Sequence, residues 1–166
     1  MRVRIFLLCL VFAITACTTP SSERVDFPVW ELPDRPLEVV QVLNGHYGEQ
    51  DFQFQVRISL GVTKMQMVGI DALGRRAFSL HWDKDGVVAE RADGVSENIK
   101  AEDILKVIIA TYWPADHPLQ QFVSDRTDDL KISYQGSRDN AWNETVEIRD
   151  PKTDYEMSIL SYELTQ

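Results

Sequence analysis

Apolar and polar residues alternate along most of the chain from Leu37 onward, as in β-strands that have one buried and one wet face. The clearest run covers residues 52–60, where five apolar side chains alternate with four polar ones. Asp85-Gly86 is a strong hairpin signal between two further runs. Short strands joined by glycine-containing turns predict an antiparallel meander. The remaining runs cover 64–70, 76–83, 87–91, 130–134, 142–149 and 154–164.

The meander is interrupted by a segment with helical periodicity. Between Ala101 and Trp113 apolar residues recur every three or four positions, and Pro114 ends the pattern. A shorter helix is predicted over residues 118–124. The order of several strands, a helical insert and about three more strands predicts a mainly β (α+β) fold.

The first sixteen residues have the features of a secretory signal peptide. Arg2 and Arg4 precede an unbroken apolar run over residues 5–13, and small residues then lead to Cys17. The apolar stretch is shorter than the about 20 residues that a membrane span needs. We therefore predict that residues 1–16 are a signal peptide that is removed.

The residues around the predicted cut resemble a lipidation signal. Ile14-Thr15-Ala16-Cys17 resembles the lipobox of bacterial lipoproteins, which implies acyl chains on Cys17. Each buried methylene is worth about 0.8 kcal/mol, so two or three chains make a lasting anchor. The alternative is ordinary secretory cleavage beside a coincidental cysteine. Thr18 stands where an aspartate would favour the inner membrane in enterobacterial lipoproteins, so the resemblance implies an outer-membrane protein that faces the periplasm.

Composition divides the mature chain into a tether and one domain. Residues 17–36 contain Thr, Ser and four prolines with little periodicity, which predicts a lipidated N-terminus and an extended tether, and 37–166 form the domain. Removal of Arg2 and Arg4 changes the net charge from −9 to −11. This charge argues against binding to nucleic acid and against electrostatic attraction to anionic lipid. The acyl chains must therefore provide the membrane attachment.

Residues 64–123 contain two short sequence motifs, each at a defined position relative to the predicted strands and helix. Leu73-Gly74-Arg75-Arg76 occupies a turn between two strands, and Trp113-Pro114 follows the helix. With the motifs in this order, the stretch 64–123 resembles LolB, the outer-membrane lipoprotein receptor of the Lol pathway. It also resembles an uncharacterised lipoprotein family related to LolB. The resemblance implies a LolA/LolB-like fold, an incomplete antiparallel β-barrel with a helical insert or lid. It also implies a lipid or lipoprotein cargo in an apolar cavity and a periplasmic LolA-like carrier as a partner.

The same resemblance gives a role to the turn at Leu73. It implies that Leu73 protrudes and helps pass cargo into the membrane. Arg75 and Arg76 put positive charge beside it, where they could meet lipid headgroups. The alternatives are that Leu73 folds back on its own hairpin, and that both arginines are solvated or pair with nearby acids.

The apolar faces of the amphipathic strands and helix supply candidates for the lining of the cavity. Methionine and aromatic side chains suit a pocket for flexible acyl or polyene chains, because they adapt their shape. The same residues can instead form a solid core, which is the more common arrangement. The candidates are Phe52, Phe54, Val56, Ile58, Met65, Met67, Phe78, Leu80, Trp82, Ile104, Ile108 and Tyr112.

Catalytic and metal-binding patterns are absent from the sequence. It contains no HExxH, no GxSxG and no phosphate-binding glycine loop. Ser79 and His81 share one strand face, and the spacing of Asp83 and Asp85 hints at a calcium loop that a hairpin explains. We therefore expect a non-enzymatic protein without cofactor or metal. It is either a lipid carrier or an accessory envelope lipoprotein that acts through protein contacts.

Overall fold

The computed structural model describes residues 21–25 and 36–164. The predicted signal peptide over residues 1–16 and the lipidation of Cys17 fall outside these residues. Both therefore stay predictions.

The strands of the described residues form one antiparallel sheet of nine strands. Their order in the sheet is β1-β6-β5-β4-β3-β2-β9-β8-β7, so most neighbours in sequence are also neighbours in space. The mainly β prediction is confirmed, and each alternating run corresponds to a strand. The strands are β1 (Ser21–Val25), β2 (Leu37–Tyr47), β3 (Gln50–Leu60), β4 (Lys64–Asp71), β5 (Arg76–Asp83), β6 (Gly86–Arg91), β7 (Lys131–Tyr134), β8 (Thr145–Asp150) and β9 (Tyr155–Glu163).

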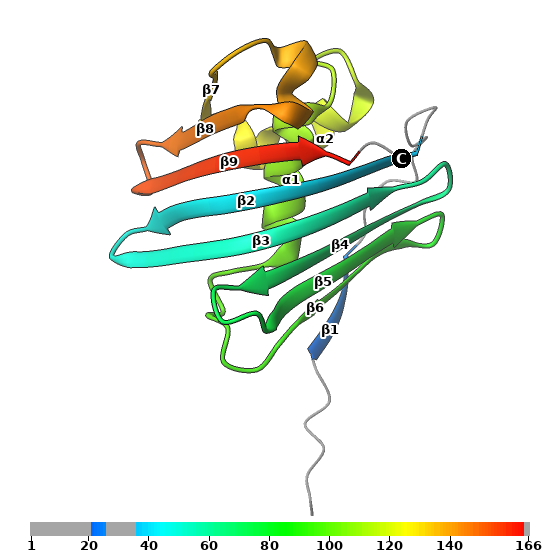
Figure 1. Cartoon of the computed structure of the whole chain (residues 1–166), viewed down its shortest axis with the longest axis vertical. Coiled ribbons are helices and arrows are strands. Elements are labelled where there is room, and N and C mark those ends of the chain that lie inside the picture. Colours follow the sequence, from blue (N-terminus) through cyan, green and yellow to red (C-terminus); the bar gives the residue numbers. More distant parts are fainter. Residues whose placement is uncertain (1–20, 26–35, 165–166) are drawn as a thin grey trace, which may run out of the picture.

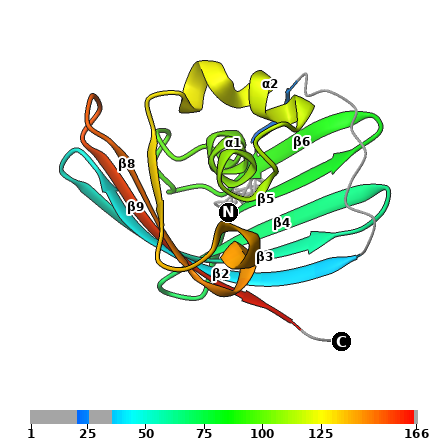
Figure 2. The same ribbon diagram turned by 90° about the horizontal axis from the view of Figure 1, so that it is seen from above.

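The sheet curves around one helix and stays open on one side. Helix α1 (Ala101–Tyr112) crosses the concave face, and α2 (Pro118–Thr127) lies across the open side (Figures 1 and 2). This arrangement is a half-barrel, consistent with the predicted incomplete barrel and helical insert. Among the described residues, no helix combines the length and the apolar character that crossing a membrane requires.

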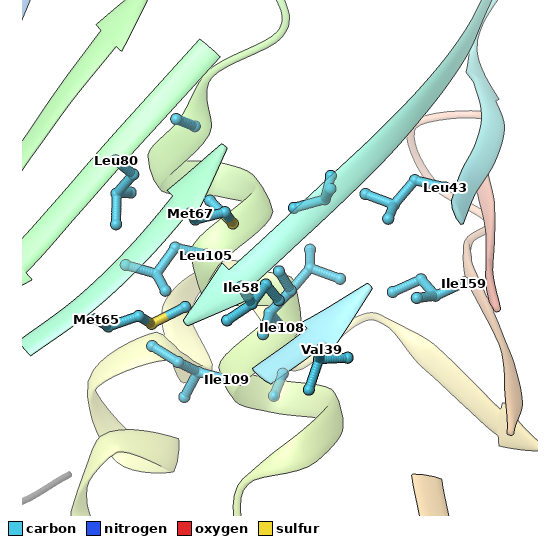
Figure 3. Packing of buried hydrophobic residues seen from close by; sticks show 14 of the residues in the cluster. Val39, Leu43, Ile58, Met65, Met67, Leu80, Leu105, Ile108, Ile109 and Ile159 are labelled. Atoms are coloured by element: carbon cyan, nitrogen blue, oxygen red, sulfur yellow. The ribbon is translucent and has the colours of Figure 1, made fainter. Parts of the chain in front are cut away.

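The core lies between the concave face of the sheet and α1. Inward side chains of the central strands, among them Val39, Ile58 and Met67, point toward Leu105 and Ile108 of α1 (Figure 3). All five side chains are fully buried. The alternation read from the sequence therefore identifies the buried face correctly, and burial of this face against α1 holds the half-barrel together.

A glycine in β4 allows a large ring to cross the strand. A Cβ atom at Gly69 would lie 2.3 Å from ring atoms of Phe78, its partner in β5. The register of β4 against β5 also shifts between Gly69 and Ile70, which is the irregularity expected of a β-bulge. Gly69 therefore makes room for the buried Phe78 ring on the concave face.

Two segments differ from the prediction. The tether expected over residues 17–36 contributes β1, which pairs with β6 at the edge of the sheet (Figure 1). The strand expected over 142–149 begins only at Thr145, because residues Arg138–Asn143 form a short 3-10 helix. In this helix Trp142 stacks on Tyr112 of α1 with ring centroids 4.1 Å apart. Aromatic packing against the helix thus replaces strand pairing at Trp142.

The N-terminus of α2 depends on a neutral histidine. The imidazole Nδ1 of His117 accepts a hydrogen bond from the backbone N–H of Leu119 (3.2 Å), and burial lowers the pKa of His117 below its ordinary value. Protonation of Nδ1 removes this acceptor. Because the unfolded chain takes up the proton first, we expect stability to be complete above about pH 6.5 and to fall as the pH drops through the lowered pKa of the folded state.

Urea denaturation at pH 7.5 and 5.5 measures this loss. His117→Asn keeps an acceptor that does not titrate and should reduce the difference between the two pH values, whereas His117→Ala should cost about 1 kcal/mol at pH 7.5. An unchanged pH dependence in His117→Asn would contradict the assignment.

Candidate functional site

The antiparallel order divides the loops of the sheet between its two ends. One end carries the β2–β3 turn (48–49), the β4–β5 turn (72–75), the loop 92–100 and the β8–β9 turn (151–154). The opposite end carries the β3–β4 turn (61–63) and the β5–β6 turn. We call the first the pocket end, because a pocket between the sheet and α1 opens there.

This pocket has a volume of about 370 Å³ and lies between the sheet and the first turns of α1. Strands β2, β3 and β9 form one wall, and α1 with the loop before it forms the other. Exposed residues stand at its mouth, so the pocket is open to solvent. Its apolar lining residues are Tyr47, Phe52, Phe54, Ile99, Ile104, Val107, Leu130, Tyr155 and Met157.

Three aromatic rings form much of the sheet wall. Phe52 stacks on Phe54 and on Tyr155, with ring centroids 6.0 and 6.4 Å apart and the ring planes within 21° of parallel. Phe54 also meets the buried Phe78 edge to face at 5.5 Å. The rings therefore join the pocket wall to the core and hold each other in place.

Gly45 in β2 lets two neighbouring strands approach this wall. A Cβ atom at Gly45 would lie 2.8 Å from the ring of Phe52 and 2.2 Å from the backbone oxygen of Glu156 in β9. Glycine is therefore required where β2 passes between Phe52 and β9. Sequence reasoning missed this residue, although an isolated glycine inside an alternating run is the signal of a close approach.

Charged groups line the helical wall beside the apolar residues. The ammonium group of Lys106 lies 3.4 Å from the carboxylate of Asp103, and only 19% of the Lys106 side chain is exposed. Lys100, Glu97 and Asp150 also line the pocket. Both signs of charge are present, so the pocket combines an apolar wall with polar groups near its mouth.

Tyr155 keeps a protonated hydroxyl inside the pocket. Burial raises the pKa of Tyr155 above its ordinary value, and the negative charge of Asp103 adds to the effect. The hydroxyl donates to the Sδ atom of Met157 at 3.3 Å, and a thioether is a weak acceptor. A ligand with a better acceptor could therefore take this hydrogen bond.

The structure places the predicted lining residues at three locations. Phe52, Phe54 and Ile104 line the pocket. Tyr112 lies at the far end of α1, where its hydroxyl meets the Oγ atom of Ser161 at 2.7 Å. The other predicted residues are buried in the core and are absent from the pocket lining: Val56, Ile58, Met65, Met67, Phe78, Leu80, Trp82 and Ile108. For these eight the structure favours the solid core that the sequence had left open, because α1 packs directly on their strands.

The turn at Leu73 is held by its own hydrogen bonds. One carboxylate oxygen of Asp71 accepts from the backbone N–H groups of Leu73 and Arg75, and the other accepts from the Arg75 guanidinium at 2.7 and 2.9 Å. The Arg75 guanidinium holds the pKa of Asp71 below its ordinary value. Leu73 is 76% exposed, so it does not fold back on its hairpin. Arg75 pairs with Asp71, and Arg76 lies 3.8 Å from Glu90.

Within residues 21–25 and 36–164, no three His, Cys, Asp or Glu side chains lie close enough together to hold a metal ion. Ser79 and His81 do not pair with each other. The Ser79 hydroxyl donates to Glu90 (3.4 Å), and the imidazole of His81 contacts Asp83 (2.9 Å). The shared strand face therefore does not bring a nucleophile to a base.

Comparison with known protein families identifies a match over most of the chain. A family described as "Protein of unknown function (DUF3261)" matches residues 38–163, which run from the second residue of β2 to the last residue of β9 and include both helices. No curated protein matches the chain.

Proposed function

Because the chain belongs to the DUF3261 family, a family of unknown function, we propose its function from the pocket: it is an outer-membrane lipoprotein that binds or hands on a lipid or an acylated protein, in the manner of LolB. This function is that of a carrier or receptor and requires no catalytic group. The membrane is its permanent partner through acyl chains on Cys17. A lipoprotein cargo and a periplasmic LolA-like carrier are its further partners.

One observation carries the proposal: the apolar interior of the half-barrel opens at the pocket end. A volume of about 370 Å³ falls in the range of about 300–1,000 Å³ that is typical of small-molecule sites. Most of the concave face is packed against α1, so the pocket admits part of a hydrocarbon chain and not a large ligand. Six methylenes transferred from water into such a pocket would contribute roughly 5 kcal/mol.

The two walls of the pocket suit an amphiphile. The rings of Phe52, Phe54 and Tyr155 and the aliphatic side chain of Ile104 offer apolar contact to a chain. Lys106, with its ammonium group beside Asp103, can meet a polar headgroup. The mixture of an apolar wall and a few polar groups is typical of sites for small amphipathic molecules.

The proposal is tested on the soluble fragment 18–166 purified from bacteria. We expect lipid to copurify with the fragment, and we expect the delipidated fragment to bind a fluorescent fatty acid with a micromolar Kd. Mass spectrometry of the extracted lipid and fluorescence titration measure these two results. A folded fragment that carries no lipid and binds no fatty acid at micromolar concentrations would refute the proposal.

The exposed side chain at Leu73 should matter for transfer into a membrane. Burial of a leucine side chain in lipid is worth about 1.5–3 kcal/mol, which a carboxylate cannot contribute. We therefore expect Leu73→Glu to slow the transfer of bound fatty acid to vesicles by roughly tenfold or more, with little effect on stability. Val62→Glu, at the opposite end and also exposed (63%), is the matched control. Transfer by Leu73→Glu at the parental rate would exclude this contact.

A second candidate is an accessory envelope lipoprotein that acts through protein contacts. The observation in its favour is that most of the concave face is packed against α1. Cross-linking in cells that captures one envelope protein, together with a harmless Leu73→Glu substitution, would support this candidate over the carrier.

A further inference from the structure

We propose that a further pocket, between β6 and the first turn of α1, binds a zwitterionic headgroup in which a primary ammonium stands beside a phosphate. The carboxylate of Glu102 pairs with the ammonium, and Lys100 meets the phosphate. This site is distinct from the proposed acyl site, and its existence does not depend on the carrier function. It adds the chemical class of a headgroup, which an apolar wall does not select.

The headgroup pocket, as we call it, has a volume of about 210 Å³. Two small side chains, Ala89 of β6 and Ala101 of α1, face this space between strand and helix. The other residues that line it are charged: Glu90, Arg91, Glu97, Lys100 and Glu102. Side chains of both signs surround one cavity, which suits a ligand that itself carries both signs of charge.

Glu102 is the buried charge of the headgroup pocket. Its exposed fraction is only 8%, yet within residues 21–25 and 36–164 its carboxylate has no hydrogen bond and no ion pair. The first turn of a helix suits a carboxylate, because the helix dipole is positive there, but the dipole does not replace a hydrogen-bond donor. Burial of a carboxylate without a donor is unfavourable. A ligand in the pocket would supply the missing donor.

The other acidic groups leave Glu102 as the buried carboxylate for a ligand. The carboxylate of Glu90 is already engaged, because it accepts from the Ser79 hydroxyl at 3.4 Å and lies 3.8 Å from Arg76. Glu97 is exposed. Among the described residues, no three acidic or metal-binding side chains converge closely enough for a metal ion. An ammonium group needs only one carboxylate, to which it donates a charge-assisted hydrogen bond.

The two basic residues explain why the ligand should also carry a negative charge. Arg91 donates to the backbone oxygen of Val95 and thereby holds the loop at the edge of the pocket. Lys100 is exposed, and in the described part of the chain its ammonium group pairs with no acid. Both cations would repel a simple amine. A phosphate beside the ammonium removes this repulsion and gives Lys100 a partner.

The headgroup pocket adjoins the apolar pocket of the proposed acyl site. Glu97 and Lys100 line both pockets, which lie on either side of the start of α1. A lipid with its acyl chain in the apolar pocket can therefore place an ethanolamine phosphate headgroup beside Glu102. Such a ligand would join the headgroup site to the proposed function. A free zwitterion of the same chemistry would bind without it.

Nuclear magnetic resonance on the soluble fragment 18–166, which keeps every described helix and strand, tests the site. The isotope-labelled fragment is titrated with phosphoethanolamine and, separately, with phosphocholine, whose quaternary ammonium has no N–H group to donate. We expect phosphoethanolamine to shift the amide signals of residues 89–91 and 97–102, with a Kd roughly tenfold lower than that of phosphocholine.

Glu102→Gln keeps the size of the side chain and removes its charge. It should raise the Kd for phosphoethanolamine by roughly tenfold or more. Glu49→Gln removes an exposed carboxylate outside both pockets and should leave the Kd unchanged. Circular dichroism shows whether the variants are folded. Ala101→Leu fills the cavity, leaves the carboxylate in place and should also weaken binding, so the test does not depend on one variant.

Lysolipids identify the source of the headgroup. Lysophosphatidylethanolamine and lysophosphatidylcholine with the same acyl chain are compared by isothermal titration calorimetry. If the source is a lipid, the ethanolamine form should bind roughly tenfold more tightly, and Glu102→Gln should remove this difference. If only free phosphoethanolamine depends on Glu102, the natural ligand is a free zwitterion.

Three results would overturn the proposal: no shifted signals at millimolar phosphoethanolamine, equal Kd values for phosphoethanolamine and phosphocholine, or parental binding by Glu102→Gln. Failure here is distinct from failure of the carrier function, because a fatty acid has no ammonium group. If the fragment binds fatty acid but does not distinguish the two headgroups, the headgroup site is wrong and the carrier function stands. If it binds phosphoethanolamine but no fatty acid, the headgroup site stands and the carrier function is wrong.

Discussion

Ile104→Trp is expected to lower the affinity of the soluble fragment for a fluorescent fatty acid by roughly fiftyfold. Ile104 lines the pocket from the first turns of α1, and an indole at this position would occupy space that the ligand needs. Displacement of three methylenes, at about 0.8 kcal/mol each, corresponds to this loss. Fluorescence titration of the delipidated protein measures it.

A matched tryptophan on the outer face of the sheet is the control. Val68 is partly exposed on the convex side of β4, away from the pocket and from α1. Val68→Trp should bind the fatty acid with parental affinity. Parental affinity in Ile104→Trp, or an equal loss in both variants, would show that the ligand does not occupy this pocket.

Ile108→Ala is expected to lower the free energy of unfolding by about 2–5 kcal/mol. Ile108 follows Ile104 by one helical turn but is fully buried in the core (Figure 3), so truncation leaves a cavity that neighbouring side chains fill only in part. Urea denaturation monitored by circular dichroism measures the loss. The folded variant should still bind the fatty acid within a few-fold of the parental affinity, because Ile108 does not line the pocket.

Ile104→Ala is the matched control for stability. Ile104 is only partly buried, so its truncation removes fewer contacts and should cost clearly less than truncation of Ile108. Equal destabilisation by the two substitutions would mean that Ile104 belongs to the core and that the pocket wall is not where the structure places it.

Ile104 and Ile108 show how much of the candidate site the sequence pattern can predict. Both belong to the helical stripe read from residues 101–113, and the spacing alone cannot distinguish a core residue from a pocket residue. The distinction depends on what lies opposite each position. Ile108 faces the centre of the sheet, whereas Ile104 faces the end where the helix wall stops and the pocket opens.

The sequence could not predict the remaining pocket residues, for a related reason. Tyr155 and Met157 come from the last strand, about 100 residues from Phe52, and they reach the same wall because β9 pairs with β2. Strand order is set by long-range pairing, for which local periodicity carries no signal. The alternating runs predicted the strands; they did not predict which strands are neighbours across 100 residues.

The sequence by itself determined strands β2 to β9, the two helices, the face of each element that turns inward, and the expectation of a signal peptide with a lipidated Cys17. These features follow from local periodicity, turn residues and the residue types around one cysteine. Only the tertiary structure decided where the interior is filled and where it is hollow, and that β1 joins the sheet edge beside β6. The physical reason is that α1, with 12 residues or about 18 Å, is shorter than the roughly 35 Å of β3 that it faces. Side chains under the body of the helix pack into a core, and those around its first turns line a pocket.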